Sequence, residues 1–328
     1  MSRLSRRGFL WGAAAGAAAI GGSHRLFAQV AEPKAPQPQS RMVDIRNPNW
    51  LKDDQVQGEV IKQMVQDGVM ALTGKKTVAD AWKQFVEPNE KVGIKYNKLT
   101  DDFTHASHWI NEAIAEGLMA AGVKRENIIV AEGVGVKWQN AEKPDETVGP
   151  EIKLSGGTTG LSAFIRTQVD CIINVPDMKE HDRAGITGAM RNLSHARGTI
   201  MPNPERFHGP GQQTCDPHIG ELCSLGLIRT KRRLNIMNGL KGVFHGGPWA
   251  KNPMWQWRHN GLLISTDALC IDKMCLDLVQ EQRRIKKTGI GPVDLFDTTR
   301  KPIFIATCAR MGLGCADLSK VEIIKIGV

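Results

Sequence analysis

The strongest constraint on the fold of this chain is a strand–helix–strand pattern between residues 92 and 131. Val92–Asn97 and Ile128–Ala131 each predict a buried strand. Between them, Ile110, Ile114 and Leu118 recur at four-residue spacing, which predicts a helix over 104–121. A strand, a helix and a strand in this order form a βαβ unit, and this unit implies a parallel sheet with a right-handed crossover.

The rest of the chain continues this alternation. Helical periodicity predicts a helix that runs from about Val56 to Gly74, and a cap at Thr77 predicts a second, short one. Four later apolar runs predict further strands: Cys171–Val175, Leu234–Met237, Ile303–Ala306 and Val321–Ile326. We therefore expect an α/β fold with a mainly parallel, Rossmann-like sheet that is flanked by helices.

Polar residues lie at or just beyond the ends of these strands. The carboxyl ends of parallel strands meet at one edge of a sheet, and ligands bind in the crevice there. The alternative is that residues leaving a strand are polar only because loops are solvated. A shared site is favoured because Lys95 and Asn97 occupy strand positions where Val or Ile is expected. The candidates are Lys95, Asn97, Glu132, Asn174, Asp177, Lys179, His181 and Asn238.

His181, Lys179 and Lys95 are the candidate catalytic residues. An imidazole exchanges a proton near neutral pH, and a neighbouring ammonium group lowers its pKa. The two lysines and the Asn side chains would hold a carboxylate or phosphate and stabilise developing negative charge. The structural alternative is that Lys179 and His181 only hydrogen-bond loop carbonyls.

The densest polar stretch also resembles a known family. Pro176-x-x-Lys179-x-His181, Thr187-Gly188-Ala189 and Arg191-Asn192 follow the third strand; further matches are Lys91–Asn97, Asn238, Gly247-Pro248, Ser265-x-Asp267, Asp272 and Gly312-Leu-Gly314. With these motifs the chain resembles the domain-of-unknown-function 362 family from about residue 55 to its end. In two departures, Arg191 replaces the usual Lys, and Asn238 stands where the family generally has Asp.

The resemblance implies site positions but no reaction. It adds Thr187, Asn192 and Asp267 to the candidate ligand-binding residues. Some relatives carry an iron–sulfur segment, but this sequence has no Cys-x-x-Cys pair, so we expect a member without a ferredoxin segment.

The N-terminus predicts export. Ser5-Arg6-Arg7-Gly8-Phe9-Leu10 reads as a twin-arginine signal, followed by an Ala/Gly-rich stretch that is too short and too weakly apolar to span a bilayer. We expect a signal peptide over 1–28, a Pro-rich tether and lead-in over 29–54, and a single α/β domain over 55–328. The expected location is the periplasm, the expected partner is the twin-arginine translocation machinery, and no stable membrane span is predicted.

Composition excludes some functions and leaves others open. Cleavage after Ala28 would remove four arginines and no acids, which lowers the formal net charge from +9 to +5; this does not predict a nucleic-acid partner. His105 and His108 have helical i, i+3 spacing, but no zinc-type ligand pattern is present, and a solvated helix start explains them better. The metal, any cofactor loaded before export and the pairing of the seven cysteines stay open.

The segment 246–260 concentrates Trp249, Trp255 and Trp257 in an irregular stretch. It is either a lid that stacks on a ligand, or a loop pinned to the body or to a second copy. The leading hypothesis is an exported protein, leaning towards an enzyme, that acts on or binds a small anionic or polar molecule. The alternative is a non-catalytic periplasmic binding or accessory protein.

Overall fold

A computed structural model describes residues 40–97, 104–131, 140–197, 199–208, 214–249, 252–290 and 302–328. The chain divides into two units, Met1–Gln37 and Pro38–Val328, and the described residues lie in the second. The predicted twin-arginine signal and Glu132 lie outside the described residues. Within the described part, no helix combines the length and hydrophobicity that a membrane-spanning segment needs.

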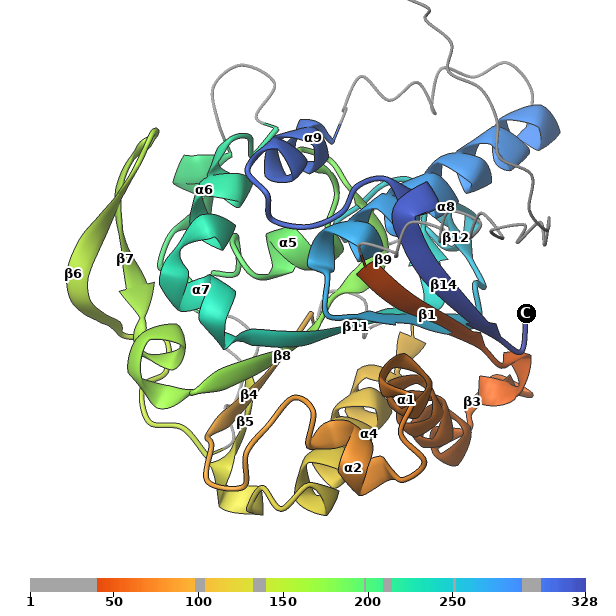
Figure 1. Ribbon diagram of the computed structural model, residues 1–328. Helices are drawn as coiled ribbons and strands as arrows, with labels where there is room; N and C mark the ends of the chain where they lie inside the picture. The colour runs from red at the N-terminus through yellow and green to blue at the C-terminus, as the bar shows by residue number, and fades with distance from the viewer. Residues whose placement is uncertain are drawn as a thin grey trace, which may run out of the picture. The chain divides into compact units, whose positions relative to one another are not determined.

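The centre of the fold is a large, mostly parallel sheet (Figure 1). Its β13 is antiparallel to both neighbours, and the other six strands on the main path share one direction. The spatial order is β14 (Val321–Ile326), β1 (Ser40–Arg46), β13 (Gly261–Ser265), β11 (Arg232–Val243), β8 (Cys171–Val175), β4 (Val92–Tyr96) and β5 (Ile128–Ala131). This arrangement confirms the predicted fold class.

Shorter strands extend or flank this sheet. The long strand β11 pairs in parallel with β9 (Asp177–His181) and antiparallel with β12 (Gln256–Trp257), while β9 pairs with β10 (Gly185–Ile186). Two separate hairpins are formed by β2 (Leu51–Lys52) with β3 (Gln55–Val56), and by β6 (Thr147–Leu154) with β7 (Gly157–Ser162).

Helices cover both faces of the sheet (Figure 1). One face packs against α1 (Gly58–Thr73), α2 (Val78–Trp82) and α4 (Ser107–Ala120). The other carries α5 (Gly188–Asn192), α6 (His218–Ser224), α7 (Gly226–Lys231), α8 (Ala268–Ile290) and α9 (Ile303–Arg310). Single-turn helices are η1 (Pro48–Trp50), η3 (Arg125–Asn127), η5 (Pro204–Phe207), η6 (Pro253–Trp255) and η8 (Leu318–Lys320), and η4 (Phe164–Gln168) is a π-helix.

The alternation of side chains along each strand explains why a polar site can form inside this fold. In β4, Val92 and Ile94 are buried towards α1 and α4. Successive side chains point to opposite faces, so Lys95 lies on the α5 face. In β8, Ile173 faces α1 and α4, which places Asn174 on the α5 face. The apolar residues named here therefore belong to the core between the sheet and α1 and α4. The polar residues Lys95 and Asn174 lie on the opposite face of the sheet, towards α5.

Two expectations about particular segments were wrong. The predicted strand over 303–306 is the start of helix α9, because its apolar pattern continues at helical spacing from Phe304 to Cys308, both fully buried. The predicted tether and lead-in over 29–54 contains β1, which lies between β13 and β14. The folded unit therefore begins before residue 55, and its second strand from the edge comes from the lead-in.

Candidate functional site

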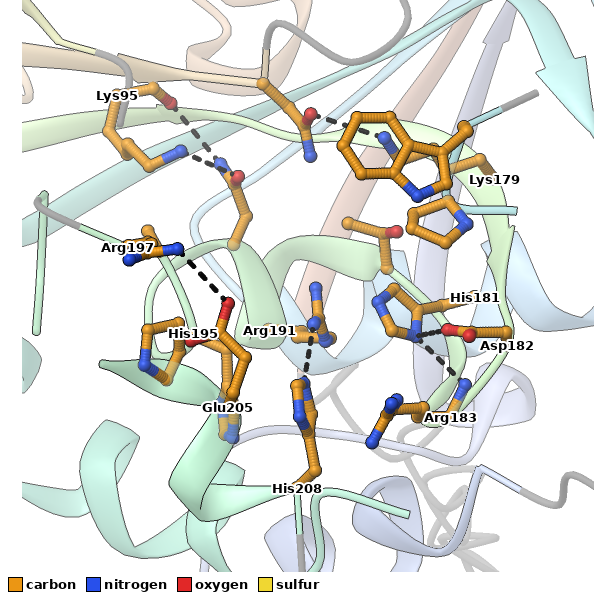
Figure 2. Close-up of a pocket in the computed structure, with 17 residues that line it drawn as sticks. Lys95, Lys179, His181, Asp182, Arg183, Arg191, His195, Arg197, Glu205 and His208 are labelled. Atoms are coloured by element: carbon orange, nitrogen blue, oxygen red, sulfur yellow. Dashed lines mark hydrogen bonds and ion pairs between the residues drawn. The ribbon is translucent and has the colours of Figure 1, made fainter. Parts of the chain in front are cut away.

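A cavity of about 730 Å³ lies where the carboxyl end of β4 meets β9 and α5. Residues from η5 and from the loop after β11 complete its wall (Figure 2). The lining residues are Lys95, Asn97, Lys179, His181, Asp182, Arg183, Thr187, Arg191, Asn192, His195, Ala196, Arg197, Pro204, Glu205, His208, Pro248 and Trp249.

A row of buried polar side chains lies beside the cavity. Lys95, Asn174 and Asn235 are aligned across β4, β8 and β11 by the strand register. Asn192 of α5 joins them: its Oδ1 accepts from Lys95 Nζ at 2.9 Å, and its Nδ2 donates to Asn174 Oδ1 at 2.7 Å. Asn174 Nδ2 in turn donates to Asn235 Oδ1 at 2.9 Å. These bonds hold α5 on the sheet and fix Lys95 at the cavity wall.

The carboxyl group of Asp272, on α8, holds the other side of α5. Asp272 is fully buried and accepts hydrogen bonds from the backbone N–H groups of Ala189 and of Met190, the latter at 3.0 Å. Burial raises the pKa of Asp272 to about 8. Gly188, with φ of +60°, makes the close approach possible, because a Cβ there would lie 2.4 Å from Asp272 Oδ1.

Lys179 lies at the centre of a second set of polar contacts. Its side chain is fully buried, and its Nζ donates to Asn97 Oδ1 at 3.2 Å. Asp177 Oδ2 lies 3.9 Å from the same Nζ, and Asp177 Oδ1 accepts from Asn238 Nδ2 at 3.3 Å. Asp177 and Asn238 do not line the cavity; they are opposite each other in the β9–β11 register and support Lys179 from beneath.

His181 presents a hydrogen-bond donor to the cavity. Its Nδ1 accepts from the backbone N–H groups of Arg183 at 3.1 Å and Ala184 at 3.3 Å. Burial, helped by the positive charges of Arg191 and Lys179, holds the pKa of His181 well below its usual value, so the ring is neutral at pH 7. A neutral ring whose Nδ1 accepts must carry its proton on Nε2. Figure 2 shows this second nitrogen directed into the cavity.

Two further imidazoles line the cavity beside Arg191. The rings of His195 and His208 stack with centroids 5.8 Å apart, and His208 lies 6.5 Å from the ring of His181. Burial and the nearby Arg191 lower the pKa of His208 to about 4, and the same causes hold the pKa of His195 well below its usual value. His195 Nε2 donates to the carbonyl oxygen of Phe207 at 3.0 Å, which fixes this ring in place.

Positive charge dominates the lining. Of the described lining residues, five have basic Lys or Arg side chains and two have carboxylates; with the imidazoles neutral, the formal excess is three positive charges. The cations are Lys95, Lys179, Arg183, Arg191 and Arg197, and the carboxylates are Asp182 and Glu205. Glu205 already faces a cation of the wall, since it lies 3.8 Å from Arg197, whereas Asp182 lies 3.2 Å from the Nδ1 atom of the neutral His181 ring. A site of this kind attracts anions.

The tryptophans of the segment 246–260 have different roles. Trp249 lines the cavity mouth and is 62% exposed. Trp255 packs edge-on against the His245 ring at 4.6 Å, and Trp257 covers Gly242, where a Cβ would lie 2.3 Å from its ring. Trp255 and Trp257 therefore attach the segment to the body, as the second alternative expects, while Trp249 lines the cavity; its role as a lid stays a prediction.

The predicted site residues that the structure describes, all but Glu132, fall into three groups. Those that line the cavity are Lys95, Asn97, Lys179, His181, Thr187 and Asn192. Those buried beneath it are Asn174, Asp177 and Asn238. Asp267 lies elsewhere: its carboxylate accepts from the backbone N–H groups of Leu269 at 2.8 Å and Cys315 at 2.7 Å, so it caps the start of α8.

Sequence reasoning missed several residues that the cavity brings together. Arg191 was noted only as a replacement within a motif, although its position in the densest polar stretch was a usable signal. Arg183 lies in the same stretch and shared this signal, and Trp249 was expected only as one of three tryptophans of a possible lid. His208 carried no such signal, because it lies in an irregular segment whose placement depends on tertiary contacts. Asn235 was not predicted as a site residue, because it lies within an apolar strand.

The part of the chain that the structure describes contains no group of three or more His, Cys, Asp or Glu side chains arranged to hold a metal ion. His108 instead lines a smaller cavity of about 250 Å³ beside α4, with Tyr96 and Arg125. The seven cysteines are all buried.

Comparison with family models finds one match. Residues 130–277, a little under half of the chain, match the model of a family described as Domain of unknown function (DUF362). The matched region carries the cavity residues from Lys179 to Trp249, whereas Lys95 and Asn97 precede it. No curated protein and no solved structure matches the chain.

Proposed function

We propose that the chain is a member of the domain-of-unknown-function 362 family whose cavity binds a small molecule through an anionic group. The observation that carries this proposal is the excess of three positive charges in the lining, at a site formed by buried, fixed side chains. Lys95 and Lys179 are fully or almost fully buried and held by the strand register, so the positions of these two cations are fixed before an anion binds. A multiply charged group, such as a phosphate ester or a dicarboxylate, matches this excess best.

The tautomer of His181 restricts the role that this side chain can have towards a bound molecule. With its proton on Nε2, the neutral ring donates to an acceptor atom of the ligand instead of removing a proton from it. Together with Lys179 and Arg191, this donor would stabilise negative charge that develops on the bound molecule. An enzyme that uses such electrostatic stabilisation is the leading candidate, and a binding protein that uses the same contacts without turnover is the second. The donor role of His181 favours neither over the other.

Binding of inorganic phosphate, measured by isothermal titration calorimetry at low ionic strength, tests the proposal. Arg191→Gln removes one charge-assisted contact, so it should weaken binding about tenfold or more. Arg229→Gln is the matched control, because Arg229 is exposed on α7 and does not line the cavity. Failure of the wild-type protein to bind phosphate, or an equal loss in both variants, would contradict the proposal.

We further propose that the protein is exported through the twin-arginine pathway to the periplasm. The support is the Arg6-Arg7 pair with the apolar, Ala/Gly-rich stretch that follows it. Replacement of both arginines by lysine should leave full-length precursor in the cytoplasm, as seen by cell fractionation and immunoblotting. Normal amounts of processed periplasmic protein from that variant would refute this part of the proposal.

A further inference from the structure

The cavity is much larger than the anion-binding set of side chains requires. Its volume of about 730 Å³ is typical of pockets that enclose a whole organic ligand. Inorganic phosphate or a simple carboxylate would occupy only the part of this space near Lys179 and His181. The remaining space extends to the mouth, where Pro248 and Trp249 form part of the wall.

Trp249 offers an open aromatic surface at this mouth. Its side chain is 62% exposed, whereas Trp255 and Trp257 are half-buried against the body. An indole ring left open to water at the rim of a pocket is suited to stacking, because a planar ligand would remove its apolar face from water. Trp249 therefore supplies a contact of a different kind from the cationic interior.

The backbone that carries Trp249 is fixed next to the anion-binding residues. Gly247, two residues before Trp249, donates its N–H to Glu180 Oε2 at 2.6 Å. Glu180 is 1% exposed and directly precedes His181 on β9. The contact is close: a Cβ on Gly247 would lie 1.9 Å from the carbonyl oxygen of Glu180. The position of the Trp249 backbone is thus tied to the strand that carries Lys179 and His181.

We propose that the occupant is an anion attached to a planar aromatic or heteroaromatic ring, as in an aryl phosphate or a nucleoside monophosphate. The anionic group binds at Lys179, Arg191 and His181, and the ring stacks on Trp249. This inference rests on the proposed function, since it assigns the second half of the molecule that the cationic site holds. It involves binding alone and requires no reaction step.

Calorimetric titrations with four probes test this inference: inorganic phosphate, ribose 5-phosphate, phenyl phosphate and AMP. The two ring-bearing probes should bind the wild-type protein at least about fivefold more tightly than inorganic phosphate, as stacking of one base on an aromatic side chain predicts. Trp249→Ala should abolish this gain and leave the affinity for inorganic phosphate unchanged. Trp249→Phe, the matched control, should retain most of the gain because it keeps a ring.

The possible outcomes separate the two proposals. If inorganic phosphate binds but the ring adds no affinity, or the gain survives Trp249→Ala, the ring proposal is overturned and the anion site stands. If ribose 5-phosphate gains as much as AMP and phenyl phosphate gains nothing, the rim recognises a sugar, and the ring proposal is likewise overturned. If no anion binds the wild-type protein, the proposed function itself fails.

Discussion

At the scale of single residues, the cavity assigns His181 a more specific role than its residue type suggests. An imidazole beside Lys179 and Arg191 has its pKa pushed well below the usual range, chiefly by burial. Two backbone N–H groups at Nδ1 then decide which nitrogen keeps the proton. The same neighbours that make the site cationic thus keep this ring neutral and make it a donor.

The donor role predicts the behaviour of two variants. His181→Ala should weaken phosphate binding about tenfold, while His181→Gln, whose side-chain amide can donate in place of Nε2, should retain part of the affinity. Calorimetry measures the affinities, and thermal unfolding serves as the control. If His181→Ala binds phosphate normally and only unfolds at a lower temperature, the ring stabilises the turn at 183–184 and does not contact the anion.

Part of the site could be predicted because it depends on strand ends alone. Lys95 and Lys179 were recognisable as polar residues at the ends of predicted strands, and the parallel sheet brings such ends together. The position of His208 depends instead on irregular backbone that is fixed by contacts such as the bond from His195 to Phe207. The spacing of apolar residues in the sequence does not indicate contacts of this kind. The position of His208 in the cavity wall could therefore be found only from the structure.

At the scale of secondary-structure elements, the short helix α5 is the main support of the cavity. It has five residues, too few to be stable by itself, and it carries both Arg191 and Asn192. Its position is set by side chains from other elements: Asn174 in β8 and Asp272 in α8. The site therefore depends on buried polar contacts that lie outside the cavity.

Removal of the Asp272 carboxyl group should show that the cavity depends on these buried contacts. Asp272→Ala leaves two buried N–H groups of α5 without their acceptor, so it should destabilise the protein by about 1–3 kcal/mol and weaken phosphate binding. Asp277→Ala on the same helix is the control, because its ion pair with Lys273 is partly exposed and should contribute about 1 kcal/mol or less. Urea unfolding and calorimetry measure both effects; equal losses in the two variants would argue against the special role of Asp272.

The elements that sequence reasoning misassigned share one property: their type is decided by neighbours. A four-residue apolar run such as Ile303–Ala306 fits a buried strand and a buried helix equally well, and its environment selects the helix α9. Strand β1 follows a Pro-rich segment, and its identity as a strand comes from pairing with β13 and β14 at distant points of the chain. By contrast, α1 was predicted well because long helical periodicity and the terminal Gly74 mark it, and β4 because its apolar run has the length of a buried strand.

At the scale of the whole molecule, the fold buries three neutral imidazoles in a cationic cavity, and this has a consequence for stability. The folded pKa values of His181, His195 and His208 lie below the unfolded value of 6.5, and that of His208 is about 4. Below pH 6.5 the unfolded chain therefore binds protons that the folded protein does not. The contribution of these three rings to stability is therefore largest above pH 6.5 and falls as the pH decreases towards the folded values. Asp272, whose folded pKa of about 8 lies above its unfolded value, contributes a slope of the opposite sign over this range.

This linkage predicts a measurable slope of the free energy of unfolding against pH. Between pH 6.5 and 5.5, the free energy of unfolding should decrease by up to about 1.4 kcal/mol per pH unit for each imidazole that stays neutral in the folded state. Urea unfolding in phosphate-free buffers measures the slope, and His208→Gln should reduce it. An identical slope in the wild-type protein and in His208→Gln would show that this ring titrates normally in the folded protein.

The central claim is that the cavity between β4, β9 and α5 is an anion site, and the most direct test is to locate a bound anion. Crystals of the wild-type protein grown with sodium tungstate, a heavy oxyanion that resembles phosphate, would reveal it by anomalous scattering. The account predicts a strong peak within hydrogen-bonding distance of Lys179, Arg191 and His181, absent from crystals of Arg191→Gln. Tungstate bound only elsewhere on the surface, with an empty cavity, would contradict it.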